Sequence, residues 1–313
     1  MLEVIDPGPL TSVQTPLGRP GWQRLGVPVG GAADAWSGRL ANRLVGNADD
    51  APLLEATLAG PTLRFEATTV VAVPGAAWQA TLDGLPLPPG HARPVRSGTR
   101  LAVGSGPGAR AYVAVAGLVL EPVLGSASTD LRTGFGGHEG RPLRAGDRLQ
   151  LAGHAGRLMR WRGSRESVGP IRIVTGPHAA WYAPDLLTGA AWQVTEAADR
   201  TGVRLLGEPA PPGERDVPSV GLPLGAVQLP PDGRPIVMLA DRPVTGGYPV
   251  VACVIRADIG RVAQLRPGDE VWFASVSVEE AVQALRRSEA ALDEVEPFSL
   301  TADDETGWAG SLD

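Results

Sequence analysis

Short apolar stretches separated by glycine and proline dominate the pattern of hydrophobic and polar positions in this chain. Each stretch alternates or runs apolar over a few residues, which is typical of strands. Asp83-Gly84 lies between two such stretches and predicts a type I′ hairpin turn. The segments that we expect to form strands include 2–5, 53–64, 69–73, 78–82, 85–87, 99–103, 109–116 and 235–239.

Two segments instead have helical spacing. Trp36, Leu40 and Leu44 recur every four residues after Asp34, a good N-cap residue, and they predict a helix that packs on a sheet. Ser277 and Glu280 have the spacing of a capping box, so we expect a second helix that ends near residue 292. The remaining segment, 293–313, is acidic and contains no basic residue, and we expect it to be disordered.

One sequence motif occurs twice in the chain. Arg19, Gly21, Leu25 and Gly26 recur 181 positions later as Arg200, Gly202, Leu206 and Gly207. Similarity at a fixed offset indicates duplication, here with a period far too long for a solenoid. We therefore expect two related lobes, residues 1–165 and 166–292. The sequence does not decide whether the lobes exchange strands. The connector between the lobes, residues 153–169, contains four arginines, Arg157, Arg160, Arg162 and Arg165. It is either a solvated linker or a surface that contacts an anion.

Composition narrows the possible chemistry. With 41 Gly and 30 Pro, the chain suits many short strands joined by tight turns, so we expect a mainly β fold. All basic residues are Arg, which excludes a biotin attachment site, a Walker A loop and a pyridoxal phosphate Schiff base on this chain. The net charge of -6 argues against nucleic acid as a partner. The histidines show no metal-ligand spacing, so we expect no metal site.

The N-terminus has no basic region followed by an apolar core, and no apolar run has the length of a membrane span. These features fit a soluble cytoplasmic protein with no membrane partner. A polar, glycine-rich stretch from Gly125 to Arg141 contains Ser126 and Ser128. No elbow motif or paired histidine marks either serine as a nucleophile, so we expect these hydroxyls to cap turns or to contact a partner.

Several motifs, taken in their order along the chain, resemble those of one known family. They are Gly18-Arg19-Pro20-Gly21, Leu40-Ala41-Asn42-Arg43-Leu44-Val45-Gly46-Asn47, Leu54-Glu55-Ala56-Thr57-Leu58-Ala59-Gly60-Pro61, the segment 125–130, Gly225-Ala226-Val227-Gln228 and Thr245-Gly246-Gly247-Tyr248-Pro249. Together they are similar to the family of 5-oxoprolinase C subunits, also called urea-amidolyase-related or allophanate hydrolase subunit 2 proteins. This family lies in the biotin-dependent carboxyltransferase-domain superfamily.

The resemblance implies two duplicated cyclophilin-like β-barrel lobes with a few short helices. It also implies a protein that is inactive alone and assembles with a homologous B subunit, and with an A subunit, for the ATP-dependent opening of 5-oxoproline to L-glutamate. ATP would then be used on other subunits, and no cofactor would be bound covalently here. One departure stands out: the family usually reads Val-Gln-Asp where this chain has Val13-Gln14-Thr15-Pro16. The missing acid either contacts substrate or only fixes a turn.

Candidate site residues follow from that chemistry. Opening a lactam develops negative charge on oxygen, so fixed donors should face the reacting carbonyl. Arg19, Arg200 and Arg204 are candidate anion binders, because a guanidinium grips a carboxylate bidentately. The residues expected to orient a small amide or lactam substrate are Asn42, Gln228, Gly246, Gly247 and Tyr248. Glu55 or Asp199 would hold an arginine or act as a base, and ion pairs within the fold remain the alternative for all of these charged residues.

Two other functions stay open at this point. The first is the carboxyltransferase component of a urea or amide carboxylase, which would use biotin on another chain. The second is a regulator without catalytic activity that binds the homologue of the B subunit, itself a kinase inhibitor, and so antagonises it. The regulator would need the interface but not Arg200 or Arg204.

Overall fold

A computed structural model describes residues 1–74, 78–153, 156–165, 168–211 and 217–300. The fold is mainly β, as the sequence predicts. The chain divides into two compact units, the first formed by residues 1–18, 35–163 and those from 292 onward, the second by 19–34 and 164–291. The second unit therefore includes a segment from the start of the chain.

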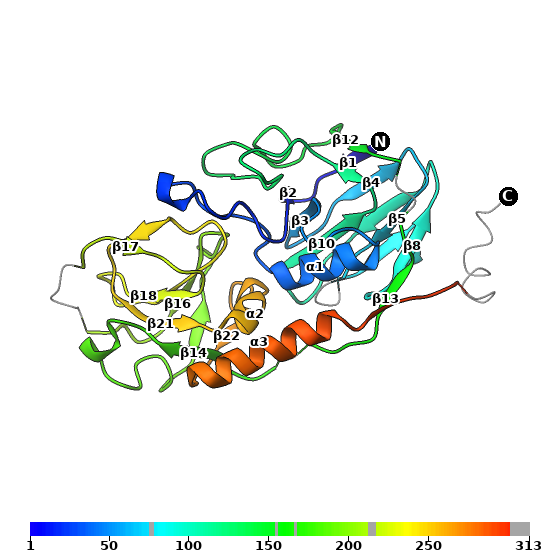
Figure 1. The fold of residues 1–313 in the computed structure, drawn as a ribbon. Helices are drawn as coiled ribbons and strands as arrows, with labels where there is room; N and C mark the ends of the chain where they lie inside the picture. The colour runs from blue at the N-terminus through cyan, green and yellow to red at the C-terminus, as the bar shows by residue number, and fades with distance from the viewer. Residues whose placement is uncertain (75–77, 154–155, 166–167, 212–216, 301–313) are drawn as a thin grey trace. The chain divides into compact units, whose positions relative to one another are not determined.

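The first unit contains two antiparallel sheets (Figure 1). One has the strand order β11 (Leu118–Val119), β12 (Arg148–Leu151), β1 (Leu2–Asp6), β4 (Thr62–Phe65), β9 (Arg100–Val103), β6 (Ala80–Leu82) and β7 (Leu85–Pro86). The other has the order β2 (Thr11–Gln14), β3 (Leu53–Thr57), β10 (Arg110–Val115), β5 (Thr69–Ala72) and β8 (Ala92–Val95). Leu2 and Val4 of the first sheet share one buried core with Val13, Leu54 and Val113 of the second.

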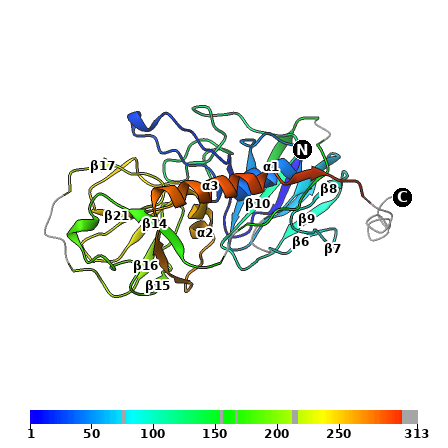
Figure 2. The same cartoon turned by 60° about the horizontal axis from the view of Figure 1, so that its bottom comes forward.

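Helix α1 (Ala35–Leu44) packs on β10 and β5, as Figure 1 shows. Trp36, Leu40 and Leu44 are buried, which confirms the predicted apolar stripe. The hairpin β6–β7, seen beside β9 in Figure 2, turns through Asp83 and Gly84. Their φ angles of 49° and 86° are both positive, as a type I′ turn requires, so the hairpin prediction is confirmed.

The second unit is a nearly closed barrel. Its strands follow the order β22 (Glu270–Val271), β15 (Trp192–Val194), β16 (Gly202–Leu206), β19 (Ile236–Met238), β18 (Ala226–Gln228), β21 (Val250–Val254), β14 (Ile171–Thr175) and β23 (Phe273–Ser275). Only Trp272 separates β22 from β23, although these strands form the two ends of the sheet. The sheet must therefore curl until its ends approach each other. A separate ribbon pairs β17 (Val220–Gly221) with β20 (Thr245–Gly246).

The second unit also contains four short helical segments, η1 (Gln23–Leu25), η2 (Ala179–Trp181), η3 (Arg256–Asp258) and α2 (Ile259–Ala263), and nearly all of the longer helix α3 (Val278–Leu292). At the start of α3 the Ser277 N–H donates to Glu280 at 2.7 Å and the Glu280 N–H donates to Ser277 Oγ at 3.1 Å. This reciprocal pair confirms the predicted capping box. None of the helices within the described ranges is long and apolar enough to span a membrane.

The two units repeat local structure as well as sequence. Strands β1 and β14 have the same alternation of buried and partly buried positions. The Asp147 carboxylate accepts the Arg144 N–H at 2.7 Å, and in the second unit the Asp269 carboxylate accepts the Arg266 N–H at 2.8 Å. Equivalent turns thus lead into β12 and β22. These likenesses support two related halves. Both copies of the repeated motif, however, lie in the second unit, the first as a loop with η1 and the second in and around β16, so the motif itself does not mark equivalent elements.

One expectation needs correction, and the structure bears on one alternative that the sequence left open. The sequence predicts disorder for 293–313, but β24 (Val295–Pro297) within this segment pairs with β13 (Met159–Trp161); residues 301–313 lie outside the described ranges. The connector also does not present a set of unpaired arginines, because Arg160 and Arg162 both form ion pairs with Glu296. Arg165 pairs with the buried Asp34 at 2.8 Å. Opposite charges nearby therefore hold these basic side chains, which argues against an anion-contacting surface there.

Candidate functional site

Two of the predicted anion binders come together in the second unit. Arg200 donates from Nε and Nη2 to the two carboxylate oxygens of Asp241 at 2.8 and 2.9 Å, and from Nη2 to the Gly31 carbonyl at 2.6 Å. Arg19 is only 1% exposed. A Cβ placed on Gly30 would lie 3.5 Å from Arg19 Nη1 and 3.8 Å from Asp241 Oδ1. Both guanidinium groups therefore border the Gly30-Gly31 turn.

Arg200 has a clear local role in this cluster. A bidentate pair with a carboxylate fixes the plane of a guanidinium, and the bond to Gly31 ties the segment 19–34 to β16 and its loop. Because Asp241 and Gly31 already use its Nε and Nη2 atoms, Arg200 fits a positioning role better than direct anion binding. Arg19, buried at the same turn, remains a candidate for contact with an anionic group.

Gln228 forms a second group with Gly246 and Tyr248. The Gln228 side chain is buried on β18 and donates from Nε2 to the Tyr248 carbonyl at 3.3 Å. A Cβ on Gly246 would lie only 2.9 Å from that nitrogen, so any larger residue would displace the amide. Gly247 and the Tyr248 ring are exposed. The segment Thr245-Gly246-Gly247-Tyr248-Pro249 thus holds the Gln228 side chain through the Tyr248 carbonyl.

The other candidates of the second unit, Asp199 and Arg204, are exposed. Asp199 is exposed, and its Oδ1 accepts the N–H groups of Thr201 and Gly202 at 2.7 and 3.1 Å. These bonds shape the turn that leads into β16. Arg204 is exposed on β16, between the buried Val203 and Leu205. Both side chains thus differ in exposure from the buried Arg19 and Arg200.

In the first unit, Glu55 belongs to a buried polar row. It lies opposite Ser12 on β2 and opposite Tyr112 on β10, so the three side chains share one face of the sheet. The Tyr112 hydroxyl donates to Glu55 Oε2 at 3.0 Å, and Arg110 Nε lies 3.7 Å from Oε1. This arrangement keeps a carboxylate inside the protein with a cation and a hydroxyl beside it. The sequence singled out Glu55 but not Ser12, Arg110 or Tyr112.

Asn42 lies in the first unit, on α1, and is fully buried. Its Nδ2 donates to the Ala51 carbonyl at 2.8 Å and to the Asp49 carbonyl at 3.3 Å. These bonds fix the loop that follows α1. The amide nitrogen is therefore occupied by backbone carbonyls, and a structural role accounts for its position.

A hydroxyl cluster lies at the end of β2, where Ser126 and Ser128 contact Thr15, a contact that the sequence did not predict. Thr15 Oγ1 is 3.0 Å from Ser126 Oγ and 3.1 Å from Ser128 Oγ, and Ser128 Oγ accepts the Thr15 N–H at 2.9 Å. Asp50 accepts the Leu17 N–H at 2.7 Å. Burial raises the pKa of Asp50, against the hydrogen bonds from Leu17 and Thr15. In the sequence, the small hydroxyl residues between positions 125 and 130 were the only indication of this cluster.

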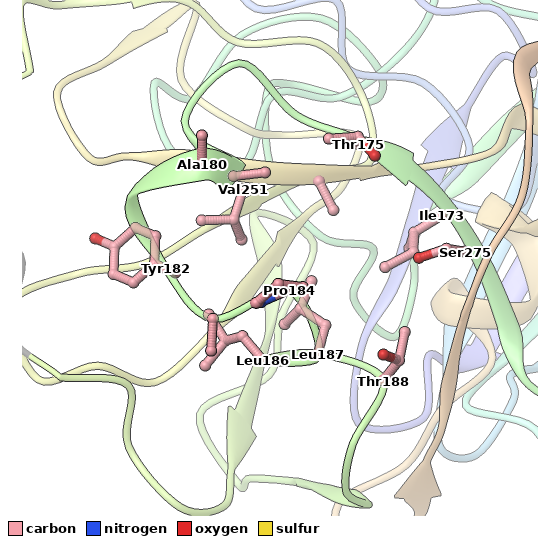
Figure 3. Close-up of a pocket in the computed structure, with 13 residues that line it drawn as sticks. Ile173, Thr175, Ala180, Tyr182, Pro184, Leu186, Leu187, Thr188, Val251 and Ser275 are labelled. Carbon is pink, nitrogen blue, oxygen red and sulfur yellow. The ribbon is translucent and has the colours of Figure 1, made fainter.

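A cavity of about 420 Å³ opens between β14, β21 and the loop that follows η2 in the second unit (Figure 3). Aliphatic side chains such as Ile173, Leu186 and Val251 line it, with hydroxyls from Thr175 and Thr188. Among the described residues around this cavity, none is charged and none is a predicted site residue. It therefore does not offer a binding site for a carboxylate substrate, since burying an unpaired charge is costly.

Comparisons with known proteins define the class. Residues 25–275 match the family described as the carboxyltransferase domain, subdomain A and B, and the chain belongs to this family. It is 39% identical to the C subunit of 5-oxoprolinase from Escherichia coli strain K12, over 91% of this chain and 94% of that protein. The C subunit of the Haemophilus influenzae 5-oxoprolinase is 36% identical, over 94% of this chain and 97% of that protein.

Urea amidolyases are similar to the chain over a small part of their own length. The Lachancea kluyveri enzyme is 33% identical over 95% of this chain but only 18% of that protein. The crystal structure of the K. lactis urea amidolyase superposes with a TM-score of 0.87 and 31% identity over 97% of this chain and 20% of that one. The fold described above is therefore shared with the carboxyltransferase-like part of a larger enzyme.

Proposed function

We propose that this chain is the C subunit of a prokaryotic 5-oxoprolinase, which opens 5-oxoproline to L-glutamate with hydrolysis of ATP. The observation that carries the proposal is the similarity to proteins named as 5-oxoprolinase C subunits along almost their whole length. The urea amidolyase of Lachancea kluyveri, in contrast, is similar to this chain over only 18% of its own length. The chain thus corresponds to nearly the whole of a 5-oxoprolinase C subunit but to only one segment of a urea amidolyase.

The buried polar groups suit this reaction. Water adds to the lactam carbonyl, the ring C–N bond breaks, and the departing nitrogen takes a proton. Arg19, buried at the Gly30-Gly31 turn that Arg200 also borders, would bind the carboxylate of 5-oxoproline. Gln228 would orient the lactam amide through its own amide. In the first unit, Glu55 accepts a hydrogen bond from Tyr112 and would hold Arg110 as its ion-pair partner.

The remaining components would come from other chains. The absence of lysine argues against a Walker A phosphate loop here, so ATP would be used elsewhere in the complex. A homologous B subunit, together with an A subunit, would complete the assembly, and the chain alone would be inactive. We place the complex in the cytoplasm, because 5-oxoproline and ATP would meet there.

A second candidate is the carboxyltransferase component of a urea or amide carboxylase. The similarity to urea amidolyases favours it. In that reaction a carboxyl group would pass from biotin on another chain to an amide nitrogen of the substrate. Because this chain has no lysine, it would not carry the biotin itself.

Reconstitution distinguishes the two candidates. The chain is co-expressed with its candidate A and B partners, and ATP-dependent release of glutamate from 5-oxoproline is measured with each of the three proteins omitted in turn. We expect glutamate only when all three are present. A complex that forms without making glutamate, but copurifies with biotinylated protein and carboxylates urea, would overturn the oxoprolinase assignment.

A further inference from the structure

Three arginines lie at one rim of the barrel in the second unit. Strands β16, β19, β18 and β21 are successive antiparallel neighbours, so the starts of β16 and β18 lie beside the ends of β19 and β21. Arg200 precedes β16, and Arg256 follows β21. Asp241 and Arg242 follow β19. The ion pair between Arg200 and Asp241 balances the first of these arginines and leaves the charges of the other two to be explained.

Arg242 is held by backbone carbonyls. Its side chain is half-buried; Nε donates to the Leu222 carbonyl at 2.9 Å, and Nη1 donates to the Leu239 carbonyl at 3.4 Å. These two bonds fix the plane of the guanidinium. Among the residues that the structure describes, none accepts a hydrogen bond from Nη2. The edge formed by Nη1 and Nη2 therefore has N–H groups left for a ligand.

Arg256 adds a second positive charge close to Arg242. Cys253, three residues before Arg256, donates from Sγ to the Leu224 carbonyl at 3.5 Å, so the end of β21 borders the same loop that Arg242 contacts at Leu222. Burial lowers the pKa of the Arg242 guanidinium, and the charge of Arg256 lowers it further. Within the described ranges, no carboxylate forms an ion pair with Arg242 or Arg256.

Such an arrangement is unfavourable without an anion. A half-buried guanidinium loses hydration that two carbonyl groups replace only in part, and the second cation adds repulsion. A bound anion would offset both costs. Two uncompensated positive charges are balanced by a doubly charged oxyanion, and a guanidinium edge donates two parallel N–H bonds to the oxygens of a phosphate group.

We propose that Arg242 and Arg256 bind a dianionic phosphoryl group at this rim of the barrel. The inference goes beyond the proposed function, in which Arg19 binds the carboxylate of 5-oxoproline and no residue of this chain binds phosphate. The proposed function contributes only a source for the group, because a reaction that hydrolyses ATP offers both nucleotide phosphates and free phosphate. Both sources present the same terminal oxygens to the two arginines.

The test measures binding of radiolabelled inorganic phosphate to the full chain by equilibrium dialysis at low ionic strength, where exposed charges are least screened. Arg242→Gln should weaken binding by about 10- to 100-fold, as expected for loss of a charged hydrogen-bond donor. Arg256→Gln should weaken it by about two- to fivefold, because this side chain is exposed. The control Arg234→Gln alters an exposed arginine before β19 and should leave binding unchanged.

Competition then identifies the source of the group. Displacement of phosphate by a non-hydrolysable ATP analogue assigns the site to nucleotide phosphates, and failure of the analogue to displace it assigns the site to free phosphate. If 5-oxoproline displaces phosphate at an equal or lower concentration, the site takes a carboxylate and the inference is wrong.

The inference also fails if the unaltered chain does not bind phosphate, or if Arg242→Gln binds it as tightly. Should Arg242→Gln not fold, the exposed Arg256→Gln decides, and unchanged binding by that variant overturns the site. None of these measurements uses glutamate release. A failure of the proposed function therefore remains distinguishable from a failure of the phosphate site.

Discussion

At the scale of single residues, the ion pair between Arg200 and Asp241 organises charge inside the second unit. Arg200 is buried, and its bidentate contact with Asp241 keeps its charge compensated inside the second unit. The repeated motif directed attention to Arg19 and Arg200, but nothing in the sequence around Asp241 marks it as the partner of Arg200. Its role depends on a contact between residues 41 positions apart. Such a partner becomes visible only when the chain is folded.

Replacing Asp241 tests this arrangement. In Asp241→Asn the buried Arg200 keeps its charge and loses its counter-ion, which typically destabilises a protein by about 3–5 kcal/mol. We expect the urea midpoint to fall accordingly. The control Glu208→Gln changes an exposed carboxylate and should shift the free energy of unfolding by less than about 0.5 kcal/mol. Equal stability of Asp241→Asn and the unaltered chain would refute the clamp.

Asp147 gives a prediction about pH. Hydrogen bonds from Arg141, together with the Arg144 N–H and the charge of His138, lower the pKa of Asp147 to about 2. The ordinary value is about 3.9. Because the folded pKa is the lower one, the carboxylate stabilises the fold above about pH 4, and this contribution disappears as pH falls toward about 2.

Asp147→Asn should therefore cost about 2 kcal/mol in the free energy of unfolding at about pH 7. The difference from the unaltered chain should shrink steadily between about pH 5 and pH 2. Urea unfolding at a series of pH values measures it. A difference that stays constant across this range would show that the Arg141 contact does not control the titration of Asp147.

At the scale of elements, the sequence is most informative where a local rule decides the structure. The capping box of α3, the apolar stripe of α1 and the Asp83-Gly84 hairpin are all set by residues close together in the chain, and all three predictions are confirmed. Strand β24 was missed because its composition is acidic. Its pairing with β13 and the contacts of Glu296 with Arg160 and Arg162 come from more than 130 residues away, as the separation of 136 for Arg160 shows.

The capping box gives a prediction local to α3. Ser277→Ala removes the oxygen that accepts the Glu280 N–H and should destabilise the helix start by about 1 kcal/mol. Hydrogen exchange of the amides in the first turn of α3 should then speed up about fivefold, since this free energy corresponds to that factor. Ser97→Ala, in an exposed turn, serves as the control. Unchanged exchange at the start of α3 would contradict the capping role.

At the scale of the whole molecule, composition and patterning predict a mainly β protein with related halves, and the structure agrees, although both copies of the repeated motif lie in the second unit. Composition and patterning do not predict that residues 19–34 belong to the second unit. That segment is attached through Arg200 to the Gly31 carbonyl and through Arg165 to Asp34, which the sequence suggested only as an N-cap. Long-range ion pairs carry no periodic signal, so the sequence cannot reveal them.

The candidate site shows the same division. The sequence named Arg19, Arg200, Glu55 and Gln228, which are all buried, but also Arg204 and Asp199, which are exposed. Residue type alone does not separate an arginine on the solvent side of a strand from one that faces the interior. The alternation of buried and exposed positions along β16 makes this distinction.

The central claim is that this chain binds the carboxylate of 5-oxoproline through the buried Arg19 as part of an oxoprolinase complex. The most direct test is the kcat/KM for ATP-dependent glutamate release by the complex carrying Arg19→Gln. We expect a fall of about 100-fold, because a charge-assisted bidentate contact contributes about 3 kcal/mol. The complex with Arg234→Gln, which alters an exposed arginine, should match the unaltered one. A folded Arg19→Gln complex with unchanged kcat/KM would contradict the account.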